Sequence, residues 1–314
     1  MVTMLDPARV ADRPLDLRVS YATDPGGRAN NEDALAVSEL PDFDPGDGQP
    51  VESMMLALAD GMGGHQRGEV ASQLAVDTTK DVILADPAGD VVPLLKQAFR
   101  RANDQIFAAW QPEGQSQMMG TTLIATIIRG KYATVASIGD SRAYLIRAGR
   151  AQQITRDHTL VADQVAQGLM TAEEARESPH RNIVLHALGH RQKLDSRLPN
   201  VFEFTLLEED RLLICSDGFN DVVPDDEIAR IVLDYDPDQV AQRLVSVAKE
   251  RGTNDNVSAI VATAMPKPDL VMANAPTASL SKRGAGSDLG PIVYIAASVV
   301  VAIIAIVLLA YFLI

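Results

Sequence analysis

The sequence predicts an α+β protein in which mainly antiparallel sheets are covered by pairs of helices. Short apolar runs that are rich in β-branched residues and bounded by turn residues are typical of strands. Two long segments with apolar residues three and four positions apart predict helices. The order along the chain is strands, two long helices, more strands, a polar helical insert, then strands and two helices. This order lacks the regular alternation of a doubly wound parallel sheet.

The individual elements follow from the same patterns. The predicted strands are Leu17–Ala22, Ala34–Ser38, Met54–Ala59, Thr121–Ile128, Thr134–Ile138, Ala143–Arg147, Val201–Leu206, Leu212–Ser216 and Val257–Ala264. The predicted helices are Gly68–Leu84, Val91–Trp110, Asp226–Leu233 and Pro237–Arg251. Between strands, His158–Leu188 is expected to form an inserted flap of short helical pieces, at Leu160–Gly168, Thr171–Arg176 and Ile183–Leu188.

Composition excludes several classes of function. The 314 residues carry a formal net charge of −14 and only 4% aromatic side chains. Binding nucleic acid through a basic face needs clustered Lys and Arg, and stacking on bases needs aromatic rings, so no nucleic-acid partner is expected. The single cysteine, Cys215, excludes a disulfide framework and a cysteine-cluster metal site.

The C-terminal segment predicts a membrane anchor. Of the 23 residues from Ile292 to Ile314, 22 are apolar, and a helix of this length matches the thickness of a hydrocarbon core. Lys282 and Arg283 precede the segment and no charge follows it, which places the rest of the chain in the cytoplasm. We therefore expect a single-pass tail anchor at 291–314, joined by a flexible Pro-, Ala-, Ser- and Gly-rich linker at 266–290.

Acidic residues stand at the ends of the predicted strands. Each of five aspartates lies where a buried strand begins or ends: Asp33, Asp60, Asp140, Asp217 and Asp255. Strands paired in one sheet could gather these carboxylates at one rim, although Asp is also simply a preferred turn residue. If they converge, their mutual repulsion is costly unless cations lie among them.

The residue types indicate which cation would fit. Ligand sets made only of oxygen suit Mg²⁺ or Mn²⁺ rather than Zn²⁺. A carboxylate shared by two such ions can hold them close enough to acidify a water between them. Gly61, directly after Asp60, lets the backbone carbonyl approach an ion, and Arg28 could offer a two-pronged donor to a phosphate oxygen.

In their order, these motifs resemble the metal-dependent protein phosphatase 2C family, its bacterial members in particular. The resemblance spans roughly residues 15–265. It is carried by Arg28-Ala-Asn-Asn-Glu-Asp33, Asp60-Gly-Met-Gly-Gly-His65, Gly68-Glu-Val-Ala-Ser72, Met119-Gly-Thr-Thr122, Ile138-Gly-Asp-Ser-Arg142, Thr155-Arg-Asp-His-Thr159, Ser216-Asp-Gly218 and Asn254-Asp-Asn256.

The resemblance implies a four-layer α-β-β-α sandwich with two metal ions, and a possible third, at one end. By carry-over, Asp60 bridges the two ions, the Gly61 carbonyl binds one, and Asp217 and Asp255 bind the other. Asp33 and Glu32 hold metal-bound waters, and Asp140 joins Asp217 at the third ion. Arg28 holds the substrate phosphate.

The implied reaction is in-line attack of a metal-bridging hydroxide on phosphoserine or phosphothreonine. Many eukaryotic relatives carry a proposed general acid, His, where this chain has Met62, and methionine cannot donate a proton. No general acid is therefore assigned, though His65 or a metal-bound water could serve. Two alternatives stay open: the same chemistry on a small phosphate ester, and a membrane adaptor that binds phosphorylated partners.

These inferences give a domain organisation and a set of partners. Residues 1–14 form an N-terminal extension, 15–265 the catalytic domain with its flap at about 158–190, 266–290 the linker and 291–314 the transmembrane helix. The expected partners are phosphorylated Ser/Thr proteins, among them a kinase and its substrates, and the membrane.

Overall fold

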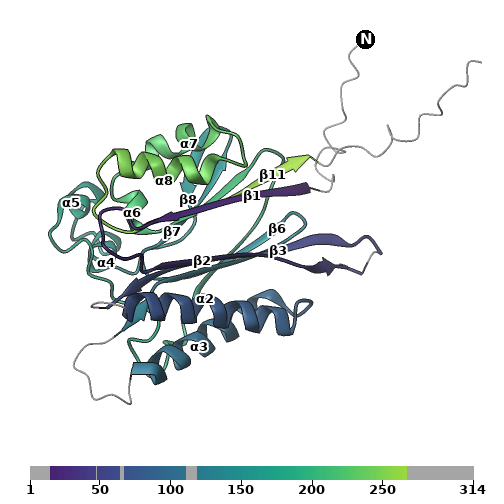
Figure 1. Cartoon of the computed structure of the whole chain (residues 1–314), viewed down its shortest axis with the longest axis horizontal. Coiled ribbons are helices and arrows are strands. Elements are labelled where there is room, and N and C mark those ends of the chain that lie inside the picture. Colours follow the sequence, from purple (N-terminus) through teal and green to yellow (C-terminus); the bar gives the residue numbers. More distant parts are fainter. Residues whose placement is uncertain (1–14, 47, 64–66, 111–118, 267–314) are drawn as a thin grey trace, which may run out of the picture. The chain divides into compact units, whose positions relative to one another are not determined.

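The computed structural model describes residues 15–46, 48–63, 67–110 and 119–266. The chain divides into two units, Met1–Pro268 and Asp269–Ile314, and all described residues belong to the first. In that unit two antiparallel sheets lie face to face, and helices cover the outer face of each (Figure 1). The predicted α+β class and the four α-β-β-α layers are confirmed.

The larger sheet supplies three of the predicted acidic positions. Its strands run in the order β2 (Asp33–Phe43), β3 (Val51–Met62), β5 (Leu123–Arg129), β6 (Tyr132–Ile138) and β9 (Asn200–Thr205), and the short β4 (Gly120–Thr121) pairs with the end of β3. Each neighbouring pair is antiparallel. The start of β2 and the ends of β3 and β6 therefore lie at the same end of the sheet, where these strands begin or terminate.

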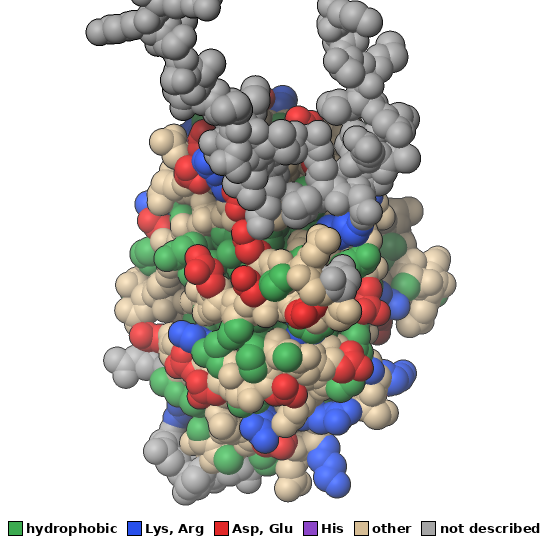
Figure 2. Space-filling model, turned by 90° about the vertical axis from the view of Figure 1, so that its right-hand side faces the viewer, with side chains coloured by type: hydrophobic (Ala, Val, Ile, Leu, Met, Phe, Trp, Pro, Cys, Tyr) green, Lys and Arg blue, Asp and Glu red, His purple; other side chains and the backbone are tan. Residues whose placement is uncertain are grey.

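The smaller sheet brings the remaining acidic positions to the same end. Its order is β1 (Leu15–Asp24), β11 (Val257–Pro266), β10 (Arg211–Cys215), β7 (Arg142–Arg147) and β8 (Arg150–Gln153). In the β1–β11 pair, Asp24 faces Val257 at one end and Leu15 faces Pro266 at the other. Figure 2 looks onto the second end, where acidic, basic and apolar side chains are interspersed.

Helices form the two outer layers. α2 (Arg67–Ala85) and α3 (Val91–Trp110) cover the larger sheet, whereas α6 (Asp217–Asn220), α7 (Asp225–Leu233) and α8 (Val240–Glu250) cover the smaller one (Figure 1). The flap helices α4 (Leu160–Ala166) and α5 (Ala172–Glu177) each begin at a threonine whose hydroxyl accepts a backbone N–H of the first turn.

The alternation of side chains in β3 explains why this strand is buried on both faces. Leu56 and Leu58 point into the core between the sheets, while Ala57 and Ala59 point to the core beneath α2 and α3. Because successive side chains of a strand face opposite ways, the small alanines let the helices approach while the leucines fill the space between the sheets. The strand is thereby fixed in register, and so is Asp60 at its end.

Two differences from the predicted elements can be explained by the backbone hydrogen bonding of the segments concerned. The predicted strands are all present, but β8 was missed because Arg150–Gln153 shows no apolar alternation; it is held by a turn in which Ala148 and Gly149 have φ of 49° and 75°. The predicted helix at Ile183–Leu188 is wrong. There Val184 and Leu188 form isolated bridges to Thr159 and Thr121, so the backbone hydrogen bonds go to other segments.

None of the helices in the described ranges is long and apolar enough to cross a membrane. The expected anchor at 291–314 lies outside those ranges. So do the N-terminal extension at 1–14 and residues 267–290 of the expected linker.

The core between the sheets gives a first prediction. Leu58 is fully buried there, and Leu58→Ala should lower the free energy of unfolding by about 2–5 kcal/mol because it removes buried methyl groups and leaves a cavity. Leu84→Ala, on α2 at a side chain 43% exposed, is the matched control and should change stability by less than about 1 kcal/mol. Denaturant titration measures both, and equal losses would contradict the assigned core.

Candidate metal centre

Strand ends from both sheets bring the predicted acidic residues around one cavity of about 530 Å³. Asp60 at the end of β3, Asp140 after β6, Asp217 after β10 and Asp255 before β11 all line it. Arg28, Glu32 and Gly61 line it as well. The structure thus brings together every predicted site residue around the cavity except Asp33, which is the β-ladder partner of Asp60 and is not part of the lining.

The backbone of Asp60 is fixed by the strand that follows α3. Its N–H donates to the Thr122 hydroxyl (2.9 Å), and its carbonyl accepts from the Thr122 N–H (2.9 Å) and the Thr121 hydroxyl (2.8 Å). These contacts hold the main chain on both sides of the peptide. The carboxylate is therefore the part of Asp60 that remains directed to the cavity.

Gly61 is required by close packing of three backbone segments. A Cβ at this position would lie 2.1 Å from the Gly68 carbonyl oxygen and 2.7 Å from that of Glu32. Gly68 in turn leaves room for the Glu32 carboxylate, which a Cβ there would meet at 2.2 Å. The two glycines let the start of α2 pack against β3, with Glu32 between the segments.

Asp33 is held in a buried hydroxyl cradle. It faces Asp60 across the β2–β3 ladder. Its Oδ2 accepts from the hydroxyls of Ser216 (2.8 Å) and Ser258 (2.7 Å), whereas its buried Oδ1 has no hydrogen-bond partner among the described residues. A buried carboxylate oxygen without a donor is costly, and here it marks a place for a cation or an ordered water.

Asp217 shows the same deficiency on the opposite wall. Its Oδ1 is buried and has no partner among the described residues. Burial, followed by the charges of Asp140 and Asp255, raises the pKa of Asp217 well above its usual value. The nearest charges therefore repel this carboxylate rather than pair with it.

The other acidic groups experience the same field. Burial and then the charge of Asp33 raise the pKa of Asp60 well above its usual value. Burial raises the pKa of Asp33 and of Asp140 to about 6, with hydroxyl donors partly offsetting it at Asp33. Four carboxyl groups in one small volume thus either keep protons or need cations at neutral pH.

Asp255 is compensated differently, by an ion pair with the predicted phosphate-binding arginine. The Arg28 Nη2 lies 2.7 Å from Asp255 Oδ2, and its Nε donates to the Asn254 carbonyl (3.2 Å). The Asn256 N–H donates to Asp255 Oδ1 (2.8 Å). Among the described residues, no three His, Cys, Asp or Glu side chains stand in a metal-holding arrangement.

The donor set fits hard divalent cations. The cavity offers carboxylate and backbone carbonyl oxygens, two buried carboxylate oxygens lack partners, and four pKa values are raised by burial and mutual repulsion. Mg²⁺ and Mn²⁺ prefer such oxygen ligands. Asp60, the Gly61 carbonyl, Asp217 and Asp140 could hold such ions, and Asp255 could join them if Arg28 took another partner.

Asn256 is a positioning residue whose role the sequence did not reveal. Its Nδ2 donates to the carbonyls of Pro25 (3.0 Å) and Asn30 (2.8 Å), and its Oδ1 accepts the Glu32 N–H (2.8 Å). This one side chain ties the loop that carries Arg28 to the start of β11. The sequence feature that could have pointed to this role is the position of Asn256 in the Asn254-Asp-Asn256 motif.

His158 is a second positioning residue, on the flap side of the cavity. Its Nδ1 accepts the Gly139 N–H (3.1 Å), and Nε2 lies 2.8 Å from the Asn200 amide nitrogen. Burial, then the neighbouring His186, lowers the pKa of His158 to about 4, so the ring is neutral and can accept that N–H. The Gly139 turn, at φ 103°, thereby presents Asp140 to the cavity.

Met62, at the position where the family resemblance places a proposed general acid, cannot donate a proton to a leaving group. Met62 and Gly63 line this part of the wall. His65 lies outside the described residues. We therefore assign no residue as the general acid.

Fold and site together define a class: two-sheet sandwiches with an oxygen-only divalent metal centre at the rim. A family model for protein phosphatase 2C matches residues 29–261. The serine/threonine protein phosphatase PstP of Mycobacterium tuberculosis is 38% identical over 250 residues, which are 79% of this chain and 45% of PstP. The serine/threonine phosphatase stp of Listeria welshimeri is 32% identical over 78% of this chain and 95% of its own length.

A solved structure agrees with these matches. The catalytic domain of PstP in complex with two manganese ions aligns with a TM-score of 0.66 and 36% identity, covering 80% of this chain and 99% of that one. The chain belongs to the protein phosphatase 2C family. It spans less than half the length of the mycobacterial PstP proteins it matches.

The raised pKa values give a prediction for the metal-free protein. A carboxyl whose pKa is higher folded than unfolded stabilises the fold fully below the unfolded pKa, near 3.8, and loses that contribution as pH rises through the folded pKa. With folded pKa values of about 6 for Asp33 and Asp140, and Asp60 and Asp217 also raised, this contribution should be lost between about pH 4 and pH 7.

The comparison that isolates this effect is Asp60→Asn against wild type in chelator. The depressed pKa of His158 acts with the opposite sign over this range, but it is common to both proteins and cancels. The variant should gain stability relative to wild type as pH rises from 4 to 7, and Mn²⁺ should stabilise wild type more than the variant. Asp77→Asn, at an exposed position on α2, is the control. A pH-independent difference for Asp60→Asn in thermal unfolding would contradict the assignment.

Proposed function

We propose that this chain is a Mn²⁺- or Mg²⁺-dependent protein serine/threonine phosphatase that hydrolyses phosphoserine and phosphothreonine. The observation that carries the proposal is the cavity in which three carboxyl groups with raised pKa values, those of Asp60, Asp140 and Asp217, adjoin Arg28. One buried oxygen each of Asp33 and Asp217 also has no hydrogen-bond partner among the described residues. The names of the relatives support the same activity.

The bound ions would supply Lewis acidity and a water made acidic enough to be a nucleophile at neutral pH. The chain's part is to hold and orient. Asp60, with its backbone clamped by Thr121 and Thr122, and the Gly61 carbonyl supply ligands from β3, while Asp217 supplies one from the other sheet. Glu32 and Asp33 lie where they can orient waters, and Asp140 with Asp217 could hold a third ion.

In this proposal Arg28 binds the substrate phosphate. Its guanidinium lies on the cavity wall with 59% of its side chain exposed, and it already pairs with an anionic group, Asp255. A planar guanidinium binds phosphate oxygens in a bidentate manner, so a phosphate would replace the carboxylate as its partner. The clamp by Asn256 keeps the Arg28 loop in place during that exchange.

The alternatives named from the sequence predict different results. An enzyme for a small phosphate ester would turn over p-nitrophenyl phosphate with a higher kcat/KM than a phosphothreonine peptide. An adaptor would bind phosphopeptides without turnover. The presence of every predicted ligand aspartate in the described part favours an enzyme.

The proposal includes attachment to the cytoplasmic face of a membrane through 291–314. The described part supports this arrangement in one respect: β11 ends at Pro266, at the end of the sheet opposite to Val257 and the cavity. A chain that continues from Pro266 therefore begins away from the substrate cavity. Because its substrates are phosphorylated on Ser or Thr, the enzyme would oppose a Ser/Thr kinase.

Metal-dependent turnover tests the phosphatase proposal. We expect Mn²⁺-dependent release of phosphate from phosphothreonine peptides. Since removing one group that stabilises developing charge typically costs about 10²–10³-fold in turnover, Asp60→Asn and Asp217→Asn should each lower kcat by at least that much. A malachite-green assay with and without chelator measures this. Asp77→Asn should match wild type; turnover that survives both substitutions and chelator would overturn the two-ion site.

Truncation tests the tether. Deleting 291–314 should release the protein from membranes in flotation or sedimentation assays while kcat/KM on a soluble phosphopeptide stays within about twofold, because the cavity is built entirely from residues before 267. Substituting the 291–314 segment with an unrelated anchor should restore membrane association. Soluble full-length protein, or a large loss of turnover on truncation, would refute the role assigned to this segment.

A further inference from the structure

A second cavity, of about 580 Å³, lies beside the metal centre on the flap side. It shares Asp140, Asp217 and Asn182 with the first cavity, so the two cavities adjoin at these residues. The flap helices α4 and α5 form one wall, and the segment from Asn220 to Asp225 forms another. A polypeptide whose phosphorylated residue enters the metal centre therefore has this cavity as its neighbour.

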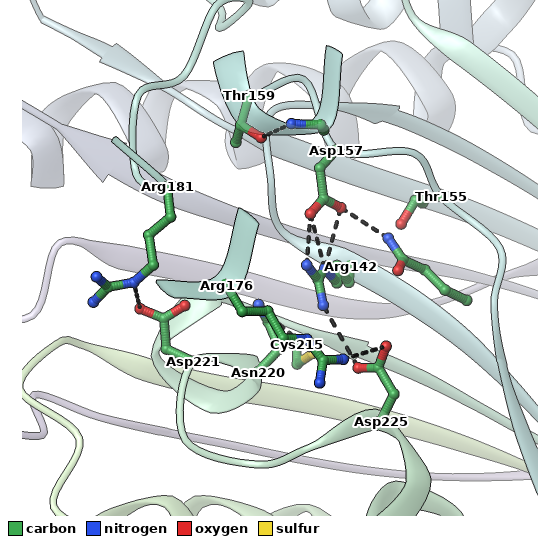
Figure 3. A network of polar contacts seen from close by, with 12 residues as sticks. Arg142, Thr155, Asp157, Thr159, Arg176, Arg181, Cys215, Asn220, Asp221 and Asp225 are labelled. Carbon is green, nitrogen blue, oxygen red and sulfur yellow. Dashed lines mark hydrogen bonds and ion pairs between the residues drawn. The ribbon is translucent and has the colours of Figure 1, made fainter. Parts of the chain in front are cut away.

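One arginine of the side cavity is fixed by its surroundings. Arg142 donates to both oxygens of Asp157 (2.7–3.1 Å) and to the Tyr144 hydroxyl (3.1 Å), and it lies 3.6 Å from Asp225 (Figure 3). Gln153 donates to the same Asp157. Such a bidentate, largely buried pair stabilises the fold. The positive charge of Arg142 is therefore already neutralised by Asp157 and is not offered to a ligand.

The other three arginines are held loosely. Arg156 pairs with Asp163 at 3.1 Å, Arg176 with Asp225 at 3.4 Å and Arg181 with Asp221 at 3.9 Å, each through a single contact. Their side chains are 58%, 62% and 48% exposed. Exposed single-contact pairs contribute little to stability, so these guanidinium groups can exchange partners at low cost.

The acidic partner of Arg176 does not depend on it. Asp225 also accepts the Tyr144 hydroxyl (3.0 Å) and faces the buried Arg142. If Arg176 turns to another anion, Asp225 keeps a hydrogen bond and a counter-charge. Apart from Asp140 and Asp217, which belong to the metal centre, the lining carries four arginines against three aspartates, Asp157, Asp221 and Asp225.

The rest of the lining suits a polypeptide rather than a free ion. Val161, Val165 and Ala175 of the flap and Val222 and Pro224 of the body give the cavity apolar walls between its charged groups. A peptide backbone with short acidic side chains can contact such walls while its carboxylates meet the arginines. Figure 3 shows Arg181 reaching from the flap to Asp221 across this space.

We propose that the side cavity binds acidic residues of the substrate polypeptide next to its phosphorylated Ser or Thr, with Arg176 and Arg181 as the residues that select them. This inference rests on the proposed phosphatase function. It adds a preference for acidic flanking sequence and assigns it to two flap residues.

The test uses two phosphothreonine peptides that differ only in Glu against Gln at the flanking positions. Wild type should show a kcat/KM about three- to tenfold higher for the Glu peptide at low ionic strength, chiefly through KM, as expected for a few exposed charge contacts. In Arg176→Gln/Arg181→Gln this ratio should fall to about one, and Arg176→Lys/Arg181→Lys should keep part of it. The ratio within each protein cancels any change in its overall turnover.

The matched control is Arg230→Gln, which removes an exposed arginine on α7 that pairs with Glu227 and does not line the cavity. It should keep the wild-type ratio, and added salt should reduce that ratio in wild type. No preference in wild type, or an undiminished preference in the double Gln variant, would overturn the proposal. If wild type hydrolyses neither peptide, the phosphatase function fails, and calorimetric binding of the two peptides then decides the preference without turnover.

Discussion

The costliest feature of this fold is the burial of several carboxylates at one rim of a β-sandwich. Asp33, Asp60, Asp140 and Asp217 have raised pKa values because water is excluded and because each feels the charge of others. Such a cluster is tolerated only when protons or cations balance it. The surrounding structure is organised to keep these groups together despite that repulsion.

The sheets supply the force that keeps them together. Asp33 and Asp60 are register partners, so slipping the β2–β3 ladder by one residue would send Leu56 and Leu58 to the wrong face as well as moving the carboxylates. Hydrophobic burial in β3 thus fixes the position of the ligand at its end. Ser216 and Ser258, from the other sheet, donate to Asp33 and join the two layers at the site.

Sequence patterns predicted the elements and site residues that depend on local chemistry. Apolar runs revealed the long strands, and the Asp residues at their ends revealed the site, since both signals lie within a few residues. β8 escaped because a tight turn after β7, not apolar periodicity, sets its pairing, and Ile183–Leu188 escaped because its bridges go to Thr159 and Thr121 in other segments. Asn256 and His158 escaped for a related reason: their roles consist of hydrogen bonds to backbone atoms that only the tertiary fold brings near.

The guanidinium of Arg28 is the candidate partner of two anions, the Asp255 carboxylate and a substrate phosphate. Within the described residues, Asp255 is the one of the five aspartates that forms an ion pair with an arginine, and we propose the same guanidinium as the phosphate-binding group. One guanidinium cannot fully satisfy both anions. A phosphate that pairs with Arg28 therefore leaves the Asp255 carboxylate without a positively charged partner. The other four carboxylates of the cluster already lack such a partner among the described residues. If Arg28 binds the substrate phosphate as we propose, phosphate binding and cation binding by the acidic cluster would favour each other, because each would remove a charge imbalance that the other creates.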